Sequence, residues 1–398
     1  MVETVRRCAR SAWPGLVVLL FFTGSVTLTR GPYLQSVTAT SAIVIWRTDV
    51  PGNSRVDYGV GDYTYSIELP DPTLEHVVTL TELITGTEVA YRVSTDGVEL
   101  ASGSFRTATG PAQSFSFAVI GDSGIGSVKQ YAVADQMVAL DPHFVLHTGD
   151  VVYPDGQAQG YDPFFFQPYQ ALARRAPIFL SLGNHDYHTQ RGQPYLDVFY
   201  LPHNNPANTE RYYSFDWGNA HFTALDFNTG PAVDQLAWLK DDLASTHQLW
   251  KIVFYHQAIY SSGPHGHEGW VEAKRQLLAP IFEQQAVDLV INGHDHDYER
   301  TLPINDVVYI VSGGGGASVY KVEPQPFSAY AETTHHTAFV TIEGCILTVL
   351  AIKPDGTVFD ATTLTKACPA PTPEPTLVPT PSLEFEWPVF LPVIWKAQ

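Results

Sequence analysis

The chain has 398 residues, and 22 lysines and arginines stand against 41 aspartates and glutamates, which gives a formal net charge of −19 at pH 7. This balance argues against nucleic acid or an anionic membrane as the main partner, because binding to a phosphate backbone requires clustered cations. A site for an anionic small substrate would have to supply local positive charge, and metal ions would do that.

Residues 1–29 have the order of a secretory signal peptide. Arginines precede an apolar run at residues 16–22, and small residues follow at 23–25. The run is too short for a comfortable membrane span, so we expect a secreted or extracellular protein with no stable membrane span. Glu3 and the lack of an Ala-x-Ala cleavage site leave an uncleaved N-terminal anchor as the alternative.

Residues 30–109 contain short alternating runs separated by Gly, Pro and Asp turns, with no helical period. Such spacing predicts a small all-β sandwich. The expected strands are residues 42–46, 54–58, 76–80, 88–93 and 104–107. With Trp46, Leu83 and Tyr91, this region resembles a fibronectin type III module, and we expect it to serve packing and spacing rather than catalysis.

Residues 112–366 alternate between apolar strands and amphipathic helices, which predicts an α/β layered domain. The expected helices are residues 128–140, 231–245 and 270–285. The expected strands are residues 115–120, 144–146, 177–182, 220–225, 252–255, 287–292 and 307–311, and a hairpin turns at residues 354–356.

A potential ligand follows, or closes, five of these strands, and in four of the five it stands next to a small residue. In α/β enzymes ligands bind at the carboxyl ends of strands, so these side chains are expected to share one site. Taken singly, each has a structural explanation: Asp122 or Asp150 as a helix cap, and His256 as a satisfied core histidine. Together they supply two Asp, one Asn, three His and one Tyr, enough for two metal ions. The five clusters are Gly121-Asp122-Ser123-Gly124, Gly149-Asp150-Val151-Val152-Tyr153, Gly183-Asn184-His185-Asp186, Val253-Phe254-Tyr255-His256 and Gly293-His294-Asp295-His296.

In order, these clusters resemble the motif set of the calcineurin-like metallophosphoesterases, and specifically of the purple acid phosphatases. The resemblance spans residues 114–364. It implies a metallophosphoesterase α/β/β/α sandwich, preceded by the fibronectin type III-like N-terminal domain of the plant-type members. A glycine run at residues 313–316 lacks the Gly-Lys-Ser/Thr of a P-loop and is expected to be a turn that crosses near the site.

The resemblance also implies the ligand set. A ferric ion, Fe(III), would be held by Asp122, Asp150, Tyr153 and His296. A divalent ion (zinc, iron or manganese) would share Asp150 and be held also by Asn184, His256 and His294. The donor chemistry agrees, because phenolate and carboxylates suit a trivalent ion, while imidazoles and an amide suit a borderline divalent one.

The implied activity is that of an acid phosphatase, which hydrolyses monoesters of small phosphorylated substrates by in-line attack of a metal-bound hydroxide. His185 is expected to protonate the leaving alkoxide. His265 and His267 resemble substrate-facing histidines of plant-type members, with solvated loop residues as the alternative.

Two other functions remain open. One is a phosphodiesterase or nucleotide pyrophosphatase of the same superfamily, and the other is a catalytically inactive cell-surface binding protein. The presence of all expected ligands favours an enzyme, and Tyr153 favours the monoesterase branch.

The C-terminal part contains a Pro/Thr-rich linker at residues 367–386 and an apolar tail at 387–398. The tail is expected to attach the protein to the cell envelope, and a strand that folds back onto the body is the alternative. Cys345 and Cys368 flank the predicted hairpin and could form a disulfide or remain two buried thiols.

Overall fold

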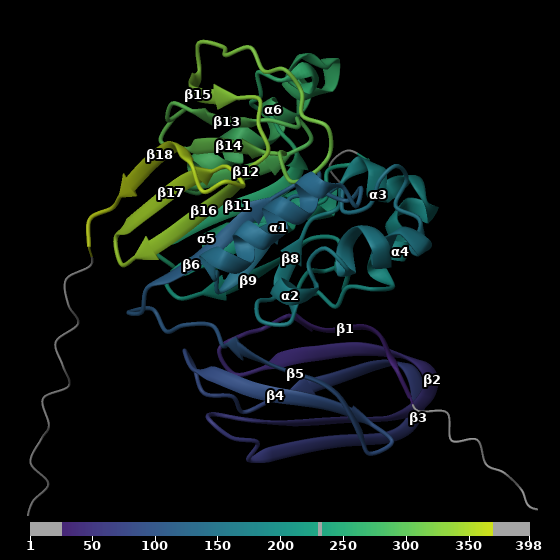
Figure 1. The fold of residues 1–398 in the computed structure, drawn as a ribbon. Helices are drawn as coiled ribbons and strands as arrows, with labels where there is room; N and C mark the ends of the chain where they lie inside the picture. The colour runs from purple at the N-terminus through teal and green to yellow at the C-terminus, as the bar shows by residue number, and fades with distance from the viewer. Residues whose placement is uncertain (1–25, 230–232, 369–398) are drawn as a thin grey trace, which may run out of the picture.

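The computed structural model describes residues 26–229 and 233–368 (Figure 1). Most of the predicted signal peptide, nearly all of the linker and the whole apolar tail lie outside these residues, as does Pro231, the expected start of one helix. None of the described helices is long and apolar enough to cross a membrane.

The N-terminal part is an all-β sandwich in which the strands pair in the order β1-β2-β4-β5, with β3 paired to β2. The predicted strands 42–46 and 54–58 are wrong as separate elements, because β2 continues through both, and the expected strand 76–80 is the end of a long β3. The register shifts around Gly52, so the Pro-Gly pair marks an irregularity within a strand rather than a chain reversal. The strands are β1 (Leu28–Gln35), β2 (Ala42–Gly59), β3 (Tyr65–Leu80), β4 (Glu88–Thr95) and β5 (Val98–Arg106).

The rest of the chain contains two mixed sheets, with strand orders β18-β17-β16-β6-β7-β8 and β15-β13-β14-β12-β11-β10-β9. Strands of the first sheet are β6 (Phe115–Ile120), β7 (Phe144–His147), β8 (Ile178–Leu180), β16 (Thr337–Glu343), β17 (Ile346–Ile352) and β18 (Val358–Thr365). Strands of the second are β9 (Tyr213–Trp217), β10 (Ala220–Ala224), β11 (Trp250–Gln257), β12 (Leu289–Gly293), β13 (Tyr298–Thr301), β14 (Val308–Ser312) and β15 (Ser328–Glu332).

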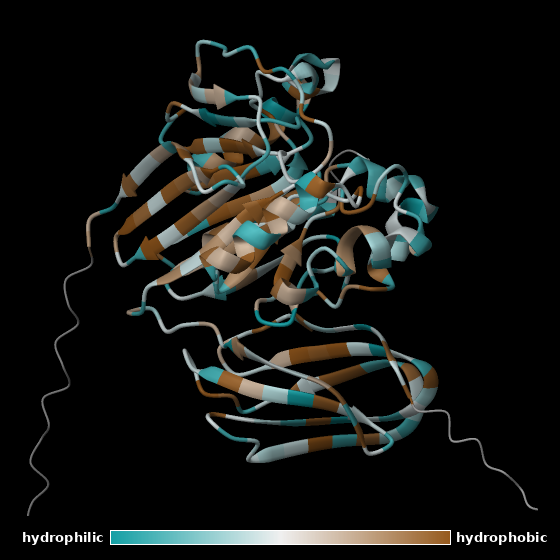
Figure 2. Cartoon of the chain, viewed as in Figure 1, coloured by the Kyte–Doolittle hydropathy of each residue, from teal (hydrophilic) through white to brown (hydrophobic). Residues whose placement is uncertain are grey.

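The two sheets pack face to face through aromatic rings. Phe117 of β6 lies edge-on to Phe222 of β10 with centroids 5.3 Å apart, and Phe179 of β8 stacks on Phe215 of β9 at 3.8 Å. Hydrophobic residues accordingly follow the strands of both sheets (Figure 2). Helices cover the outer faces, so the layers are α/β/β/α, as the sequence predicted (Figure 1).

The predicted helices are present. The long helices are α1 (Val128–Leu140), α5 (Val233–Ser245) and α6 (Gly269–Gln284). Shorter helical segments in the connections are η1 (Ala158–Gly160), η2 (Asp162–Phe166), α2 (Gln170–Ala173), α3 (Asn184–His188), η3 (Gln190–Gly192), α4 (Gln193–Leu196) and η4 (Pro264–His267).

Strand β1 docks the sandwich onto the larger domain. Tyr33 donates to the Val198 carbonyl at 2.8 Å, and the Gln35 amide donates to the Ile178 carbonyl at 3.0 Å. From β4, Tyr91 donates to the Arg174 carbonyl at 2.8 Å. One continuous hydrophobic core includes residues of both parts, so they form a single packed body.

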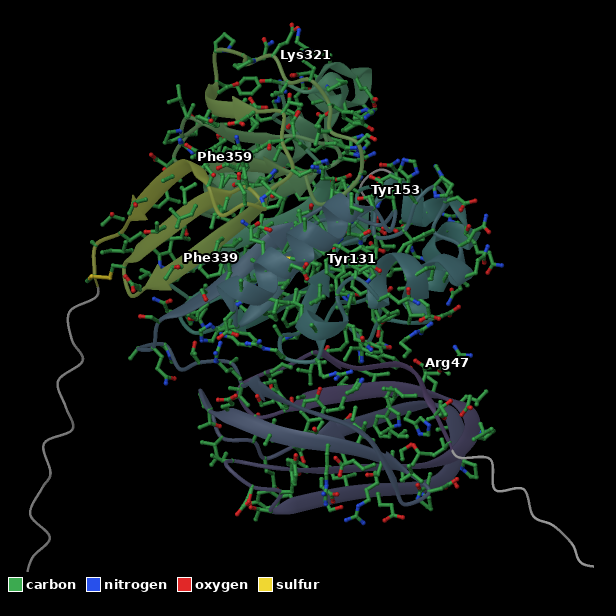
Figure 3. The ribbon with its side chains drawn as sticks, viewed as in Figure 1. Arg47, Tyr131, Tyr153, Lys321, Phe339 and Phe359 are labelled. Carbon is green, nitrogen blue, oxygen red and sulfur yellow. A yellow bond between two sulfur atoms is a disulfide. The ribbon has the colours of Figure 1, made fainter. Side chains whose placement is uncertain are left out.

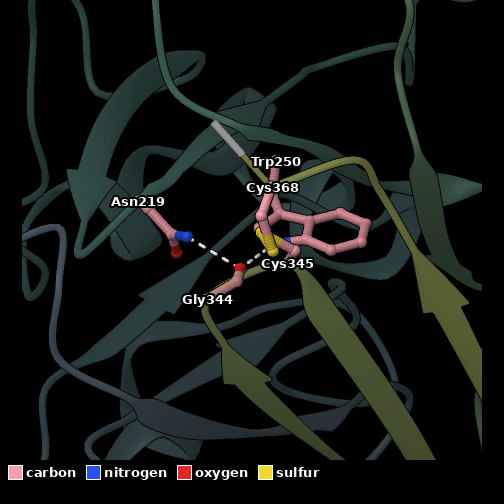
Figure 4. The surroundings of a disulfide bond; sticks show 5 residues. All are labelled: Asn219, Trp250, Gly344, Cys345 and Cys368. Atoms are coloured by element: carbon pink, nitrogen blue, oxygen red, sulfur yellow. Dashed lines mark hydrogen bonds between the residues drawn. A yellow bond between two sulfur atoms is a disulfide. The ribbon is translucent and has the colours of Figure 1, made fainter. Parts of the chain in front are cut away.

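A disulfide joins Cys345 to Cys368, with Cα atoms 5.4 Å apart, so the alternative of two free thiols is wrong. It closes the β17–β18 hairpin at the edge of the first sheet (Figure 3). The neighbouring Gly344 carbonyl accepts hydrogen bonds from the Trp250 indole at 2.9 Å and the Asn219 amide at 2.8 Å (Figure 4). The hairpin end is thereby fixed to the second sheet.

Candidate metal centre

The carboxyl ends of parallel strands from both sheets meet at one edge of the domain. β6, β7 and β8 run parallel in the first sheet, and β11 and β12 run parallel in the second. Each strand ends at, or just before, one of the predicted ligands, so topology alone brings all of them to this edge.

The first group of donors contains Tyr153, Asp122 and His296. The Tyr153 hydroxyl lies 3.1 Å from Asp122 Oδ1 and 3.0 Å from His296 Nε2. His296 Nε2 is 3.4 Å from the same carboxylate oxygen. Three oxygen and nitrogen donors therefore converge on one point.

The second group is centred on His256. Its Nε2 atom lies 2.9 Å from Asn184 Oδ1, 3.1 Å from His294 Nδ1 and 3.4 Å from Asp150 Oδ2. The same Nε2 is 4.0 Å from Asp122 Oδ1, which belongs to the first group. The two groups therefore adjoin, and all seven predicted ligand side chains lie in one cluster, in which Tyr153 and Asn184 are half-buried and the other five are buried.

Three of these residues have left-handed backbone, with φ of 58° at Asp122, 54° at Asp150 and 72° at His294. Such conformations cost a non-glycine residue about 1–3 kcal/mol and persist where the surrounding structure fixes them. Here side-chain bonds do so, because Asp122 accepts the His294 amide at 2.8 Å and Asp150 accepts the His185 amide at 2.9 Å.

Neighbouring glycines allow this close approach. A Cβ at Gly183 would collide with the Asp150 carboxylate, and a Cβ at Gly293 would collide with that of Asp122. The run 313–316 crosses beside them, since the Gly315 amide donates to the Gly121 carbonyl at 3.0 Å. The expectation that this run crosses near the site is confirmed, although the backbone bends here without forming a hydrogen-bonded turn.

Hydrogen bonds orient the imidazoles. His256 Nδ1 contacts the Thr148 carbonyl at 2.9 Å, and His296 Nδ1 contacts the Ser318 carbonyl at 2.8 Å. A carbonyl can only accept, so both Nδ1 atoms carry the hydrogen and each Nε2 is left to point into the cluster.

Asp186 holds the backbone of two segments that carry predicted ligands. It is fully buried and accepts amide hydrogens from Gly183 at 2.9 Å and from Val151 at 3.0 Å. Burial, and then the charge of Asp150, raises its pKa to about 7. Sequence reasoning placed Asp186 in a motif but did not predict this role.

The electrostatics of the cluster favour cations. Burial alone would lower the pKa of His256, but the carboxylates of Asp150 and Asp122 raise it to about 9. Burial, followed by the charges of these carboxylates, holds the pKa of Tyr153 well above its ordinary value. The phenol would ionise here only beside a strong cation. This donor set therefore fits metal ions.

His185 lies at the open side of the cluster, half-buried. Its Nδ1 contacts the Pro154 carbonyl at 2.5 Å, and its Nε2 lies 3.9 Å from Asp150 Oδ2. Its ring packs against that of Tyr153, with centroids 4.5 Å apart. The free ring nitrogen is thus directed toward the ligands.

The structure separates the two loop histidines. The His265 ring lies 4.1 Å from that of His294, and its Nδ1 is 2.7 Å from Glu268 Oε1. His267 is exposed, and within the described ranges no hydrogen bond or ring contact joins it to a predicted ligand. Sequence reasoning did not predict Glu268 or Tyr320, whose ring stacks on His296 at 4.0 Å.

Comparison with known proteins agrees with this geometry. The family model described as calcineurin-like phosphoesterase matches residues 115–298. Purple acid phosphatase 3 of Arabidopsis thaliana is 30% identical over 264 residues, which cover 54% of this chain and 68% of that protein. Purple acid phosphatase 22 of the same plant is 29% identical over 288 residues, which cover 65% of this chain and 64% of that protein.

Among solved structures, a purple acid phosphatase from yellow lupin (Lupinus luteus) seeds matches with a TM-score of 0.70 at 21% identity, covering 85% of this chain and 74% of its own. At that identity the match concerns the fold, including the all-β sandwich before the α/β domain. The sequence relatives and the family model show that the chain belongs to the purple acid phosphatase family of calcineurin-like phosphoesterases, which are hydrolases acting on phosphate esters.

Proposed function

We propose that the chain is a secreted acid phosphatase with a dinuclear metal centre that hydrolyses small phosphate monoesters. One observation carries the proposal: the seven donor side chains converge as two adjoining groups at the shared edge of two sheets. The disulfide supports an oxidising compartment, where such bonds persist.

The two groups differ in donor chemistry. Tyr153, Asp122 and His296 offer the hard anionic oxygens suited to Fe(III). His256, His294 and Asn184 offer neutral nitrogens and an amide oxygen, suited to zinc, ferrous iron or manganese. Asp150 would serve both ions. When bound, the ions would supply positive charge for the phosphate dianion and lower the pKa of a water molecule so that it attacks phosphorus as hydroxide.

The protein's own part in the reaction is proton transfer and positioning. As the new O–P bond forms and the ester P–O bond breaks, the leaving oxygen gains negative charge and needs a proton. His185 carries its Nδ1 hydrogen toward the Pro154 carbonyl, so Nε2 is the nitrogen free to donate. Solvent then returns a proton to His185.

His265 has a place beside the substrate, because its ring covers the outer side of His294. In its protonated form it would add positive charge where a phosphate oxygen binds. His267, being exposed, would reach the substrate only from the loop surface.

The test is hydrolysis of a phosphate monoester and a matched diester by the purified, metal-loaded protein at pH 5. We expect monoester turnover that chelation abolishes and that Asn184→Ala lowers by at least about 100-fold. Asn53→Ala, a change in β2 of the N-terminal sandwich, is the control. Faster diester turnover would instead support the phosphodiesterase alternative, and metal binding without turnover would support the inactive binding protein.

A further inference from the structure

Half-buried aromatic rings contact the two more deeply buried histidines of the Gly-His-x-His motif. The Tyr320 ring stacks on His296, with centroids 4.0 Å apart and planes 11° apart. The His265 ring lies 4.1 Å from that of His294, and His265 and Tyr320 are 5.7 Å apart. The mouth of the cluster is therefore bounded by flat rings on this side.

Trp270, at the start of α6, extends this boundary, because its ring lies 6.1 Å from that of His294. One carboxylate holds two of the rings: Glu268 accepts from the Trp270 indole and from His265 Nδ1. The Lys274 ammonium lies 4.1 Å from the centre of the indole ring, on one of its faces. We call Tyr320, His265 and Trp270 the aromatic rim.

Among the residues that the structure describes, no free ammonium group lies at the rim. Lys274 is buried and donates to the Phe227 carbonyl at 2.9 Å, and Lys321, which follows Tyr320 in the sequence, pairs with Glu323 at 2.6 Å. The exposed side chain of Glu268 adds negative charge, whereas the charge of Glu323 is balanced by Lys321. Such a surface disfavours substrates with a second anionic group and favours a neutral, flat group that can lie against a ring.

We propose that the aromatic rim binds the leaving group, so that the preferred substrates are phosphate monoesters whose alcohol carries a neutral aromatic ring next to the phosphate. This inference deepens the proposed phosphatase function and rests on it. Trp270 is the specificity-determining residue, because it borders the site without contacting a predicted ligand by hydrogen bond.

The test compares benzyl phosphate with cyclohexylmethyl phosphate, whose alcohols are similar in size and in pKa but differ in flatness. For the metal-loaded wild type we expect kcat/KM to favour the benzyl ester about 3- to 10-fold, the range for one aromatic contact. The ratio falls to about 1 in Trp270→Leu and is largely kept in Trp270→Phe. Tyr65→Leu, an exposed ring of the N-terminal sandwich, is the control and keeps the wild-type ratio.

Calorimetric binding of benzylphosphonate and cyclohexylmethylphosphonate to the same metal-loaded proteins gives a readout that does not depend on turnover. Similar Kd values in the wild type, or a benzyl preference that survives in Trp270→Leu, overturns the role of the rim. Hydrolysis of neither ester by the wild type refutes the proposed phosphatase, and the phosphonate binding still decides whether the rim selects aromatic groups.

Discussion

The proposed role of His185 as a proton donor can be tested separately from metal binding. Its ring nitrogens have different surroundings, one bonded to the Pro154 carbonyl and the other directed toward Asp150. Loss of a proton donor slows the reaction only for substrates whose leaving group needs a proton. Loss of a metal ligand should slow the reaction for all substrates.

We therefore predict that His185→Asn lowers kcat for an alkyl phosphate by about 100-fold or more. The same change should lower kcat for 4-nitrophenyl phosphate far less, because nitrophenolate leaves without protonation. His188→Asn, an exposed neighbour on α3, is the control. Equal losses for both substrates, or a lower metal content in His185→Asn, would contradict the role of proton donor.

Asp186 carries a second prediction at this scale. Its carboxylate accepts backbone amides from two segments that present ligands, and an asparagine amide group would turn hydrogens toward some of these donors. We expect Asp186→Asn to weaken metal binding by about 10- to 100-fold, as loss of residues that support ligands does. Competition with a chelator measures it, with exposed Asp197→Asn as control; unchanged affinity would refute the supporting role.

At the scale of elements, the strands that end in ligands were predictable because each is an apolar run that leads to a polar donor, with a small residue before the donor in every case except His256. Strand β13 was not predicted, because Glu299 and Arg300 interrupt any apolar run in this segment. Arg300 pairs with Asp360 on β18 at 2.7 Å, and Glu299 accepts the Ser262 hydroxyl at 2.5 Å. Partners so distant in sequence neutralise the charges, and no local pattern reveals them.

Site residues were predictable where they follow strands, and unpredictable where their place depends on contacts between distant parts of the sequence. The seven ligands follow or close strands, so topology gathers them. Tyr320, Glu268 and Trp270 come from connections, and their approach to the ligands depends on how those connections fold over the edge of the sheets. Asp186 was visible in a motif, but its three-dimensional contacts were not.

The packing of β9, β10 and α5 depends on a buried charge. His221 on β10 lies 2.6 Å from Asp216 of β9 and 3.0 Å from Asp242 of α5. Burial would lower its pKa, but bonds to both carboxylates raise it to about 9. Because the folded pKa exceeds the unfolded value, the stability it contributes is complete below about pH 6.5 and is lost as the pH rises through 9.

We predict that His221→Gln lowers the free energy of unfolding by about 1–3 kcal/mol at pH 6 and by much less at pH 9.5. Urea unfolding of the metal-loaded protein at both pH values measures the difference. His247→Gln, an exposed histidine just after α5, should show little effect at either pH. A loss that is the same at pH 6 and pH 9.5 would show that packing, not charge, is responsible.

At the scale of the whole molecule, the proposed function requires an acidic protein to bind an anionic substrate, which is possible where local charge outweighs net charge. The chain carries −19, yet its buried carboxylates are arranged to hold cations. The sandwich shares a core with the catalytic domain through β1, so it is a fixed part of the enzyme rather than a tethered module.

The most direct test is metal analysis with a visible absorption spectrum of the purified protein and of Tyr153→Phe. The proposal predicts about one iron and one divalent ion per chain and a purple tyrosinate-to-iron band that disappears in the variant. A colourless protein with two divalent ions would contradict the ferric site at Tyr153, and a protein that binds no metal would contradict the dinuclear centre itself.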